Sequence, residues 1–144
     1  MKMKLAEVKN RHQALCMLGN KKLPVKLSYA ISKNIMKLQE ELEVIEKTRI
    51  KLVEQYAEKD EDGNCKITED GKYNVGENEQ KLNDEFVEFL NSDVDMDIQL
   101  VSESIVESLE DARYDALTPA ELISIDFMME HLQEIFLEKS EVTT

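Results

Sequence analysis

Apolar residues recur at helical spacing along most of the chain. Leucines and valines three or four positions apart predict a short amphipathic helix over residues 5–18. Pro24 follows in a lysine-rich linker and favours the start of a second helix, because its fixed φ suits the first helical turn. No glycine or proline interrupts residues 25–58, so the pattern predicts a helical hairpin over residues 5–58.

A seam of residues at alternating steps of four and three runs along this long helix: Ile31, Ile35, Leu38, Leu42, Ile45, Arg49, Leu52 and Tyr56. Such heptad spacing is typical of a coiled coil or a long helical hairpin. Arg49 interrupts the apolar seam and must either snorkel past its neighbours or pair with an acid. Packing within the chain and contact with a partner or a second copy are both open, and the eight residues are the candidate partner interface.

The pattern changes after the long helix. Residues 58–64 are acidic and contain Gly63, which predicts a turn. Two short stretches then flank Asp70-Gly71, the typical turn of a β-hairpin over residues 65–75.

The acidic turn partly matches a calcium-binding loop. Counted from Glu58, Asp60, Asp62, Gly63 and Glu69 stand where an EF-hand has ligands and its glycine. The predicted hairpin, however, replaces the exit helix that an EF-hand requires. We therefore expect no specific calcium site.

The last third of the chain alternates between helical and extended patterns. Residues 78–91 predict a helix with Phe86 on its apolar face. Strict alternation over residues 94–100 predicts a strand that joins the hairpin in a small antiparallel sheet. A polar connection over 102–117 has a short helix near Val106.

A capping box indicates where the final helix begins. Thr118 is the expected N-cap, Pro119 the first helical residue and Glu121 the reciprocal cap of a helix over 118–137. The predicted fold is thus α+β and mostly helical: a long coiled-coil-like helix in a helical hairpin, a small antiparallel sheet and a C-terminal helix.

Composition limits the class of protein. A chain of 144 residues with 42% hydrophobic residues predicts a single domain over residues 1–144, divided into residues 5–58, 59–101 and 118–137. We expect neither a transmembrane segment nor a signal peptide, because no apolar run is long enough and the first residues are charged. Cys16 and Cys65 are too few for a disulfide scaffold.

Charge is distributed unevenly. Residues 1–39 carry nine bases and one acid, for a net charge of +8, whereas residues 40–144 carry −21. The two parts can attract each other within the fold or between subunits, or the basic end can meet an acidic partner. Tyr29 is the only aromatic residue of the basic part, so we expect no direct nucleic-acid binding.

The residues expected of an enzyme are missing. The sequence has no Gly-rich phosphate loop, nucleophile elbow or cluster of metal ligands, and His12 and His131 are far apart. Asp93, Asp95 and Asp97 share one face of the predicted strand, but a solvated face needs polar residues in any case. We expect no catalytic residues, no metal and no cofactor.

A resemblance covers nearly the whole chain. The block Lys22-Leu23-Pro24-Val25-Lys26-Leu27-Ser28-Tyr29, the long acidic helix and the stretch 56–64 resemble a family of small proteins from tailed phages and prophages of Gram-positive bacteria, catalogued as a domain of unknown function. The resemblance implies a viral origin and a non-enzymatic role, but transfers no site residue.

Two functions are compatible with these features. One is a phage assembly or structural-accessory protein that acts through protein–protein contacts, with a homo-oligomer among its expected states. The other is an acidic inhibitor of a host restriction or CRISPR nuclease that imitates nucleic acid. Either would act in the host bacterial cytoplasm, and the first could also be associated with the virion.

Overall fold

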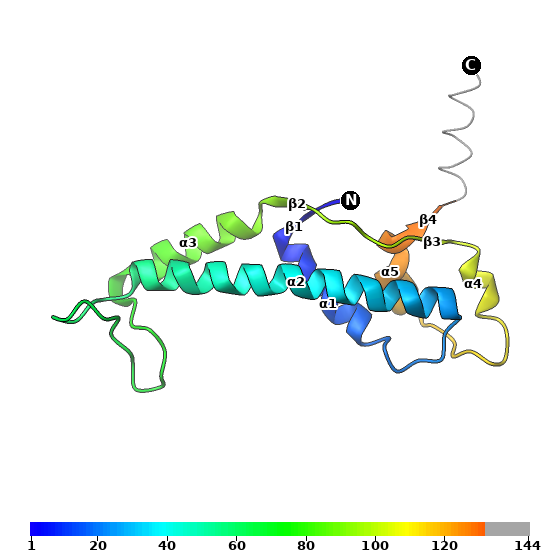
Figure 1. Cartoon of the computed structure of the whole chain (residues 1–144), viewed down its shortest axis with the longest axis horizontal. Helices are drawn as coiled ribbons and strands as arrows, with labels where there is room; N and C mark the ends of the chain where they lie inside the picture. The colour runs from blue at the N-terminus through cyan, green and yellow to red at the C-terminus, as the bar shows by residue number, and fades with distance from the viewer. Residues whose placement is uncertain (132–144) are drawn as a thin grey trace, which may run out of the picture. The chain divides into compact units, whose positions relative to one another are not determined.

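Three helices hold most of the secondary structure. The computed structural model describes residues 1–131, in which α1 spans Leu5–Cys16, α2 spans Val25–Tyr56 and α3 spans Glu79–Leu90 (Figure 1). The shorter helices are η1 (Gly76–Asn78), α4 (Ile105–Ser108), α5 (Pro119–Ile125) and η2 (Asp126–Met128). The fold is α+β and mostly helical, as the sequence predicts.

Two pairs of short strands complete the described secondary structure. β1 (Lys2–Lys4) runs antiparallel to β2 (Asp93–Asp95), with Met3 opposite Val94. β3 (Val101–Ser102) runs parallel to β4 (Met129–Glu130). A small antiparallel sheet is therefore present, but the residues before α1 supply one of its strands, which the hydrophobic pattern does not predict.

The prediction that residues 94–100 join the hairpin is wrong. β2 pairs with β1 instead of the hairpin, and this pairing continues to Met96, whose N–H donates to the Met1 carbonyl and whose carbonyl accepts from the Met1 amino group, both at 2.8 Å. The alternating pattern instead reflects burial, since Met96 and Ile98 are 6% and 9% exposed while Asp97 between them is exposed.

The chain divides into two compact units. Within residues 1–131, the first contains Met1, Lys9–Gln39 and the chain from Met96 to His131, and the second contains Lys2–Val8 and Glu40–Asp95. Helix α2 contributes residues to both. Whether they behave as the single domain expected from the length stays a prediction.

A leucine-rich core fills the first unit. Its fully buried side chains include those of Leu15, Leu18, Leu27, Leu38, Ile125 and Met128. Asn34 is the only buried polar residue among residues 1–131. Its amide nitrogen donates to the Gln99 carbonyl at 3.0 Å, and its amide oxygen accepts from the Gln99 N–H at 2.7 Å. The Asn34 amide thus satisfies both backbone groups of Gln99 as a neighbouring strand would.

The second unit has a thinner core. Its buried residues are Met3, Leu5, Val8, Ile45 and Ala57. No residue of α3 is fully buried, and the predicted apolar face of this helix is half-buried. Phe86 and Phe89 on that face have ring centroids 6.1 Å apart.

The predicted hairpin is confirmed as part of a larger element, which we call the arm (Glu58–Val75). The arm has two turns of the same geometry, eight residues apart. The Asp60 N–H donates to the Asn64 carbonyl at 2.8 Å, and the Thr68 N–H donates to the Lys72 carbonyl at 2.7 Å. Gly63 and Gly71 both have a φ of 83°, which favours glycine.

Three backbone hydrogen bonds close the base of the arm. The Glu58 N–H donates to Asn74, the Asn74 N–H to Lys66 and the Lys66 N–H to Glu58, at 2.7–2.8 Å. This ring orders the arm although nearly all its side chains are exposed.

The C-terminal helix begins where the capping box predicts, but it ends early. Thr118 and Glu121 form both bonds of the capping box, with Pro119 as the first helical residue. At Met129 the backbone becomes extended, with φ −90° and ψ 134°, and pairs with β3. The prediction of a continuous helix is therefore wrong up to residue 131, and residues 132–137 lie outside the described part.

We expect Asn34→Leu to lower the free energy of unfolding by about 2–4 kcal/mol, because it leaves both backbone groups of Gln99 without their partner. Urea denaturation followed by circular dichroism measures this change. The matched control is Asn10→Leu at an exposed position of α1, which we expect to change stability by less than about 0.5 kcal/mol. Equal effects of the two substitutions would contradict the role of Asn34.

Candidate functional site

A hollow in the first unit lies beside the start of α2. We call it the α2–β3 groove: Val25, Lys26, Tyr29 and Ala30 of α2, the segment Gln99–Ser102, Ser104 and residues of α4 line it, and its volume is about 720 Å³. Its walls combine apolar residues such as Leu100 with the hydroxyls of Ser102, Ser104 and Ser108 and with Lys26. This size falls in the range of roughly 300–1,000 Å³ that binding pockets usually have.

The groove is built on Asn34. Because this amide holds Gln99 by both backbone groups, the segment Gln99–Ser102 is fixed beside α2. A second anchor lies one turn further along the helix, where Lys37 pairs with Asp97 at 3.5 Å. Side chains of α2, which forms one wall of the groove, thus position the segment Gln99–Ser102, which forms the other wall.

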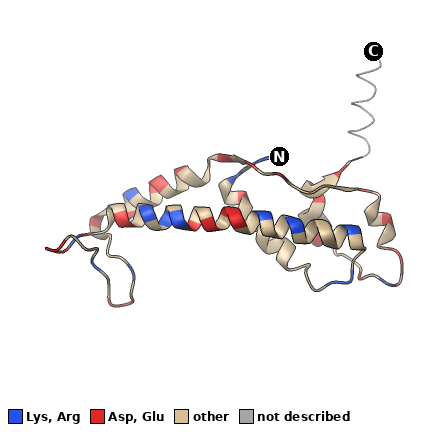
Figure 2. Ribbon diagram, in the orientation of Figure 1, with Lys and Arg blue, Asp and Glu red and all other residues tan. Residues whose placement is uncertain are grey.

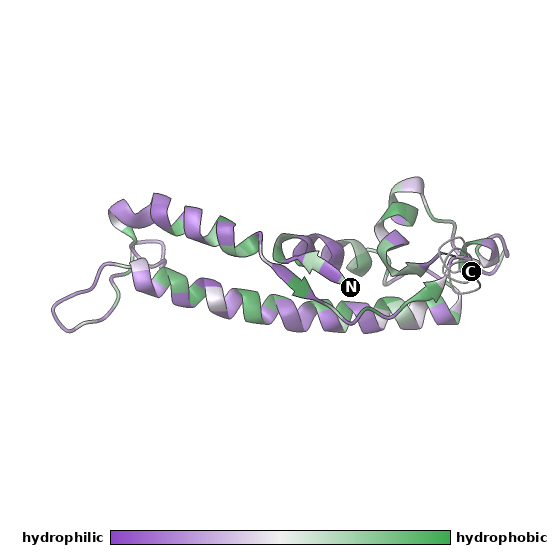
Figure 3. Cartoon of the chain, turned by 90° about the horizontal axis from the view of Figure 1, so that it is seen from above, coloured by the Kyte–Doolittle hydropathy of each residue, from purple (hydrophilic) through white to green (hydrophobic). Residues whose placement is uncertain are grey.

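An exposed apolar face continues from the groove along α2. Val25 is 81% exposed, Tyr29 57% and Met36 63%. Their spacing of four and seven places them on one side of the helix. Figure 3 shows apolar residues recurring along the whole of α2. Since buried leucines already form the opposite side, this second apolar face is unpartnered among the described residues.

The same stretch of helix is basic. Residues 20–39 contain five lysines and no acid, and Figure 2 shows no red residue on this part of α2. Lys21 and Lys37 form ion pairs. Lys26 and Lys33 form none within residues 1–131, and the Lys33 ammonium lies 5.9 Å from the centre of the Tyr29 ring. The exposed face is therefore both apolar and positively charged.

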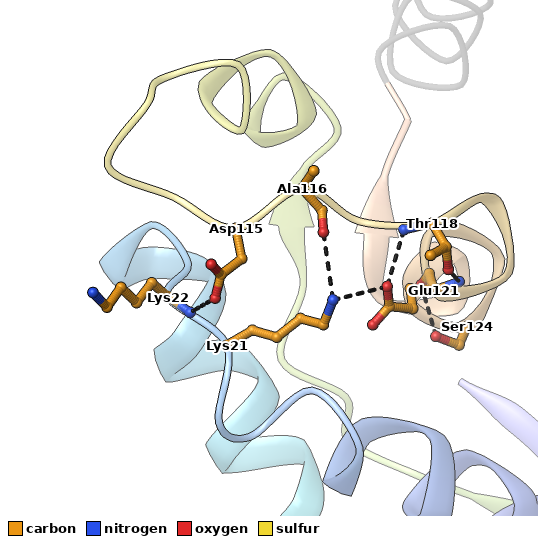
Figure 4. A network of polar contacts seen from close by, with 7 residues as sticks. All are labelled: Lys21, Lys22, Asp115, Ala116, Thr118, Glu121 and Ser124. Carbon is orange, nitrogen blue, oxygen red and sulfur yellow. Dashed lines mark hydrogen bonds and ion pairs between the residues drawn. The ribbon is translucent and has the colours of Figure 1, made fainter.

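A polar network ties the linker before α2 to the chain around α5 (Figure 4). Lys21 Nζ lies 3.0 Å from Glu121 Oε1 and donates to the Ala116 carbonyl at 3.4 Å. Lys22 and Asp115 exchange two bonds: the Lys22 N–H donates to Asp115 Oδ2 at 2.7 Å, and the Asp115 N–H donates to the Lys22 carbonyl at 2.8 Å. These contacts hold the beginning of α2 in place.

Glu121 serves two partners with one oxygen. Its Oε1 accepts from the Thr118 N–H at 2.9 Å and also binds Lys21. The pKa of Glu121 is lowered first by the Thr118 backbone bond and then by Lys21. The capping box that the sequence predicts thus also anchors the linker, which the sequence alone does not indicate.

The predicted seam divides into buried and accessible residues. Ile31, Leu38 and Ile45 are buried, at 3%, 0% and 8% exposure. Ile35, Leu42, Leu52 and Tyr56 are half-buried, and Arg49 is exposed. Much of the seam is therefore covered by the chain itself. An acidic substitution at a buried seam position would mainly lower the stability of the fold, so it would not report on association.

The polar end of the seam has partners in the second unit. Arg49 forms a two-bond ion pair with Glu46 on its own helix, at 2.6 and 3.0 Å, which is one of the two outcomes expected for a charge in the seam. The Tyr56 hydroxyl donates to Glu85 Oε2 at 2.6 Å, and this bond raises the pKa of Tyr56. Arg49 also lines a smaller hollow of about 460 Å³.

The calcium-like segment does not form a single loop. The Lys66 N–H, in the middle of residues 58–69, is bonded back to Glu58, so the segment spans parts of both turns of the arm. Asp60 Oδ1 accepts the N–H groups of Asp62 and Asn64, both at 2.9 Å. Within the described residues, no three His, Cys, Asp or Glu side chains are placed to hold a metal ion.

Residues with catalytic potential are scattered. Cys16 Sγ lies 3.7 Å from His12 Nε2 on α1. His131 stands between Glu103, at 2.8 Å, and Asp126, at 3.3 Å. Asp93 and Asp95 belong to β2, whereas Asp97 pairs with Lys37. The structure does not bring these groups together into one site.

Comparison with known proteins adds no assignment: no family model, curated protein or solved structure matches the chain. Among residues 1–131, no helix has the length and apolar character needed to span a membrane. The groove and the adjoining face of α2 are consequently identified by geometry alone. The block from Lys22 to Tyr29 supplies part of this surface, but its pairing with Gln99–Ser102 could not be seen in the sequence.

The lowered pKa of Glu121 predicts a pH dependence of stability. A carboxyl whose pKa is lower in the folded state stabilises the fold above its unfolded pKa, and this contribution disappears as the pH falls through the folded value. We expect Glu121→Gln to remove the corresponding part of the stability gained between acid and neutral pH, measured by urea unfolding from pH 3 to 7. The exposed control Glu110→Gln should keep the wild-type profile; identical profiles of the wild type and Glu121→Gln would contradict this role.

Proposed function

We propose that this chain acts without catalysis, by binding another protein, as a phage-encoded assembly or structural-accessory protein. The α2–β3 groove and the adjoining face of α2 are its docking surface. The observation that carries the proposal is the exposure of Val25, Tyr29 and Met36 along one side of a helix whose other side is already packed. Exposed apolar groups that recur along an ordered element favour a contact surface.

The charge of this surface indicates the chemistry of its partner. Lys26 and Lys33 stand beside the apolar residues, and no acid lies within residues 20–39. A second copy docking with the same face would bring like charges together, which is unfavourable. The surface therefore favours a partner segment that carries both apolar and acidic side chains.

The phage assignment depends on the resemblance of the block Lys22–Tyr29 and its continuation to the tailed-phage family. Gene order tests it independently. Genes for virion components on both sides would support an assembly role, whereas an early or accessory locus would favour an inhibitor of a host nuclease.

One observation favours that inhibitor as the second candidate. The exposed turns of the arm present Glu61, Asp62, Glu69 and Asp70. Acids on a protruding element can imitate a nucleic-acid backbone. The affinity of such an inhibitor for its nuclease should fall as ionic strength rises, because salt screens the attraction between charges.

The docking surface is tested by substituting its apolar residues with acids. We expect the double variant Val25→Asp, Tyr29→Asp to weaken partner binding at least about tenfold, because it places negative charge in a surface that takes acidic groups. Both positions are exposed, and Val25 is the first residue of α2, where an acid suits the helix dipole, so the fold should persist.

The matched control is Val44→Asp, which changes a residue of α2 that is 56% exposed but outside the groove. The tagged wild-type chain captures proteins from phage-producing cells, and these proteins are identified. Their affinities for the wild type, the double variant and the control are then compared. A partner that binds all three equally well would contradict the proposed surface.

A further inference from the structure

The arm is ordered but contributes little to the core of its own chain. All side chains of the arm are exposed except those of Cys65, Asn74 and Val75, which are half-buried. The ring of backbone bonds through Glu58, Lys66 and Asn74 nevertheless holds both turns in a defined conformation. Ordering a chain costs entropy, and here burial of side chains within the chain does little to offset that cost. The arm thus has the properties of an element that binds another molecule: a defined backbone and exposed side chains.

The arm presents an apolar pair. Ile67 and Tyr73 lie directly opposite each other in an antiparallel bridge. Side chains of such a pair project from the same face. Ile67 is 63% exposed and Tyr73 37% exposed. Ile67 is the uncovered member of the pair, whereas Tyr73 is partly covered and lines the smaller hollow beside Arg49 and Val53.

The arm that carries this pair is acidic overall. The arm contains six acids and three lysines, so its net charge is −3. Glu61 and Glu69 occupy equivalent positions in the two turns, and both are exposed. The arm therefore combines apolar and acidic groups, which is the chemistry that the α2–β3 groove and its lysines favour.

We propose that the arm of one copy docks in the α2–β3 groove of a second copy, so that the chain assembles head to tail. Ile67 and Tyr73 enter the groove, where Tyr29 offers an aromatic ring, and the acids of the turns lie against Lys26 and Lys33. Because arm and groove are different surfaces, the contact is heterologous and leaves one free arm and one free groove for further copies.

This inference rests on the proposed function, since it identifies the partner of the same groove. Charge favours this contact over the alternative between two identical faces. Two basic grooves would repel each other, whereas an arm with net charge −3 and a groove flanked by Lys26 and Lys33 attract. The contact should accordingly weaken as salt concentration rises.

The test exchanges the charges of the two surfaces and measures mass by sedimentation velocity on the purified full-length chain at low ionic strength. We expect the wild type to associate progressively at concentrations up to about 100 μM. Variant Glu61→Lys, Glu69→Lys alters the arm, and variant Lys26→Glu, Lys33→Glu alters the groove. Each alone should associate at least about tenfold more weakly, because its arm and groove then carry charges of the same sign.

Mixing the two variants is the decisive step. The altered arm should fit the altered groove, and the remaining arm and groove are both wild type, so association should return to near the wild-type level. The control Glu40→Lys, Glu43→Lys makes the same change of charge at exposed positions of α2 and should associate like the wild type. Circular dichroism verifies that every variant is folded.

The apolar pair is tested separately with Ile67→Ser. We expect it to weaken association about tenfold, whereas Ile123→Ser at a residue of α5 that is 75% exposed should have no effect. A wild-type chain that stays monomeric, or folded variants whose mixture does not associate, would overturn the inference. The proposed function would survive either result if Val25→Asp, Tyr29→Asp weakened the binding of a different protein at least about tenfold.

Discussion

The groove depends on the two hydrogen bonds between the Asn34 amide and the backbone of Gln99. A buried amide with unsatisfied groups would be costly, and so would an extended segment whose backbone lacked partners. The hydrogen bonds between the Asn34 amide and the Gln99 backbone satisfy both sets of polar groups, so neither desolvation cost remains. The result is a strand-like segment held against a helix, which fixes Gln99–Ser102 as a wall of the groove. Helix α2 is thereby a scaffold on its buried side and a candidate docking surface on its exposed side.

The distribution of charge gives the two proposed contact surfaces opposite signs. Two of the lysines of this basic stretch form ion pairs inside the first unit: Lys21 binds Glu121, and Lys37 binds Asp97. Lys26 and Lys33 are left to face solvent beside exposed apolar residues. The acids of the arm, in the second unit, have the opposite sign. The attraction between the basic and acidic parts of the chain can therefore act between copies.

Local signals explain why much of the fold could be predicted. The periodicity of α1, α2 and α3 and the capping box at Thr118 are encoded within a few residues, so the helices were found nearly at their observed positions. The hairpin was found from Asp70-Gly71. By contrast, β1 is three residues long and its partner β2 is about ninety residues away, so no local pattern distinguishes it. The same reason accounts for the early end of α5, because Met129 is drawn into the pair with β3.

The sequence by itself determined the long helix, the separation of charge and the presence of an exposed acidic turn, since these follow from composition and short-range spacing. It also indicated the seam, but not which of its residues the chain covers: Leu38 is buried, whereas Arg49 is exposed. Only the tertiary structure decided that Asn34 binds Gln99, that a groove forms beside Tyr29 and that the arm leaves Ile67 uncovered. These features depend on pairings between distant segments, which are selected by packing and hydrogen bonding in three dimensions.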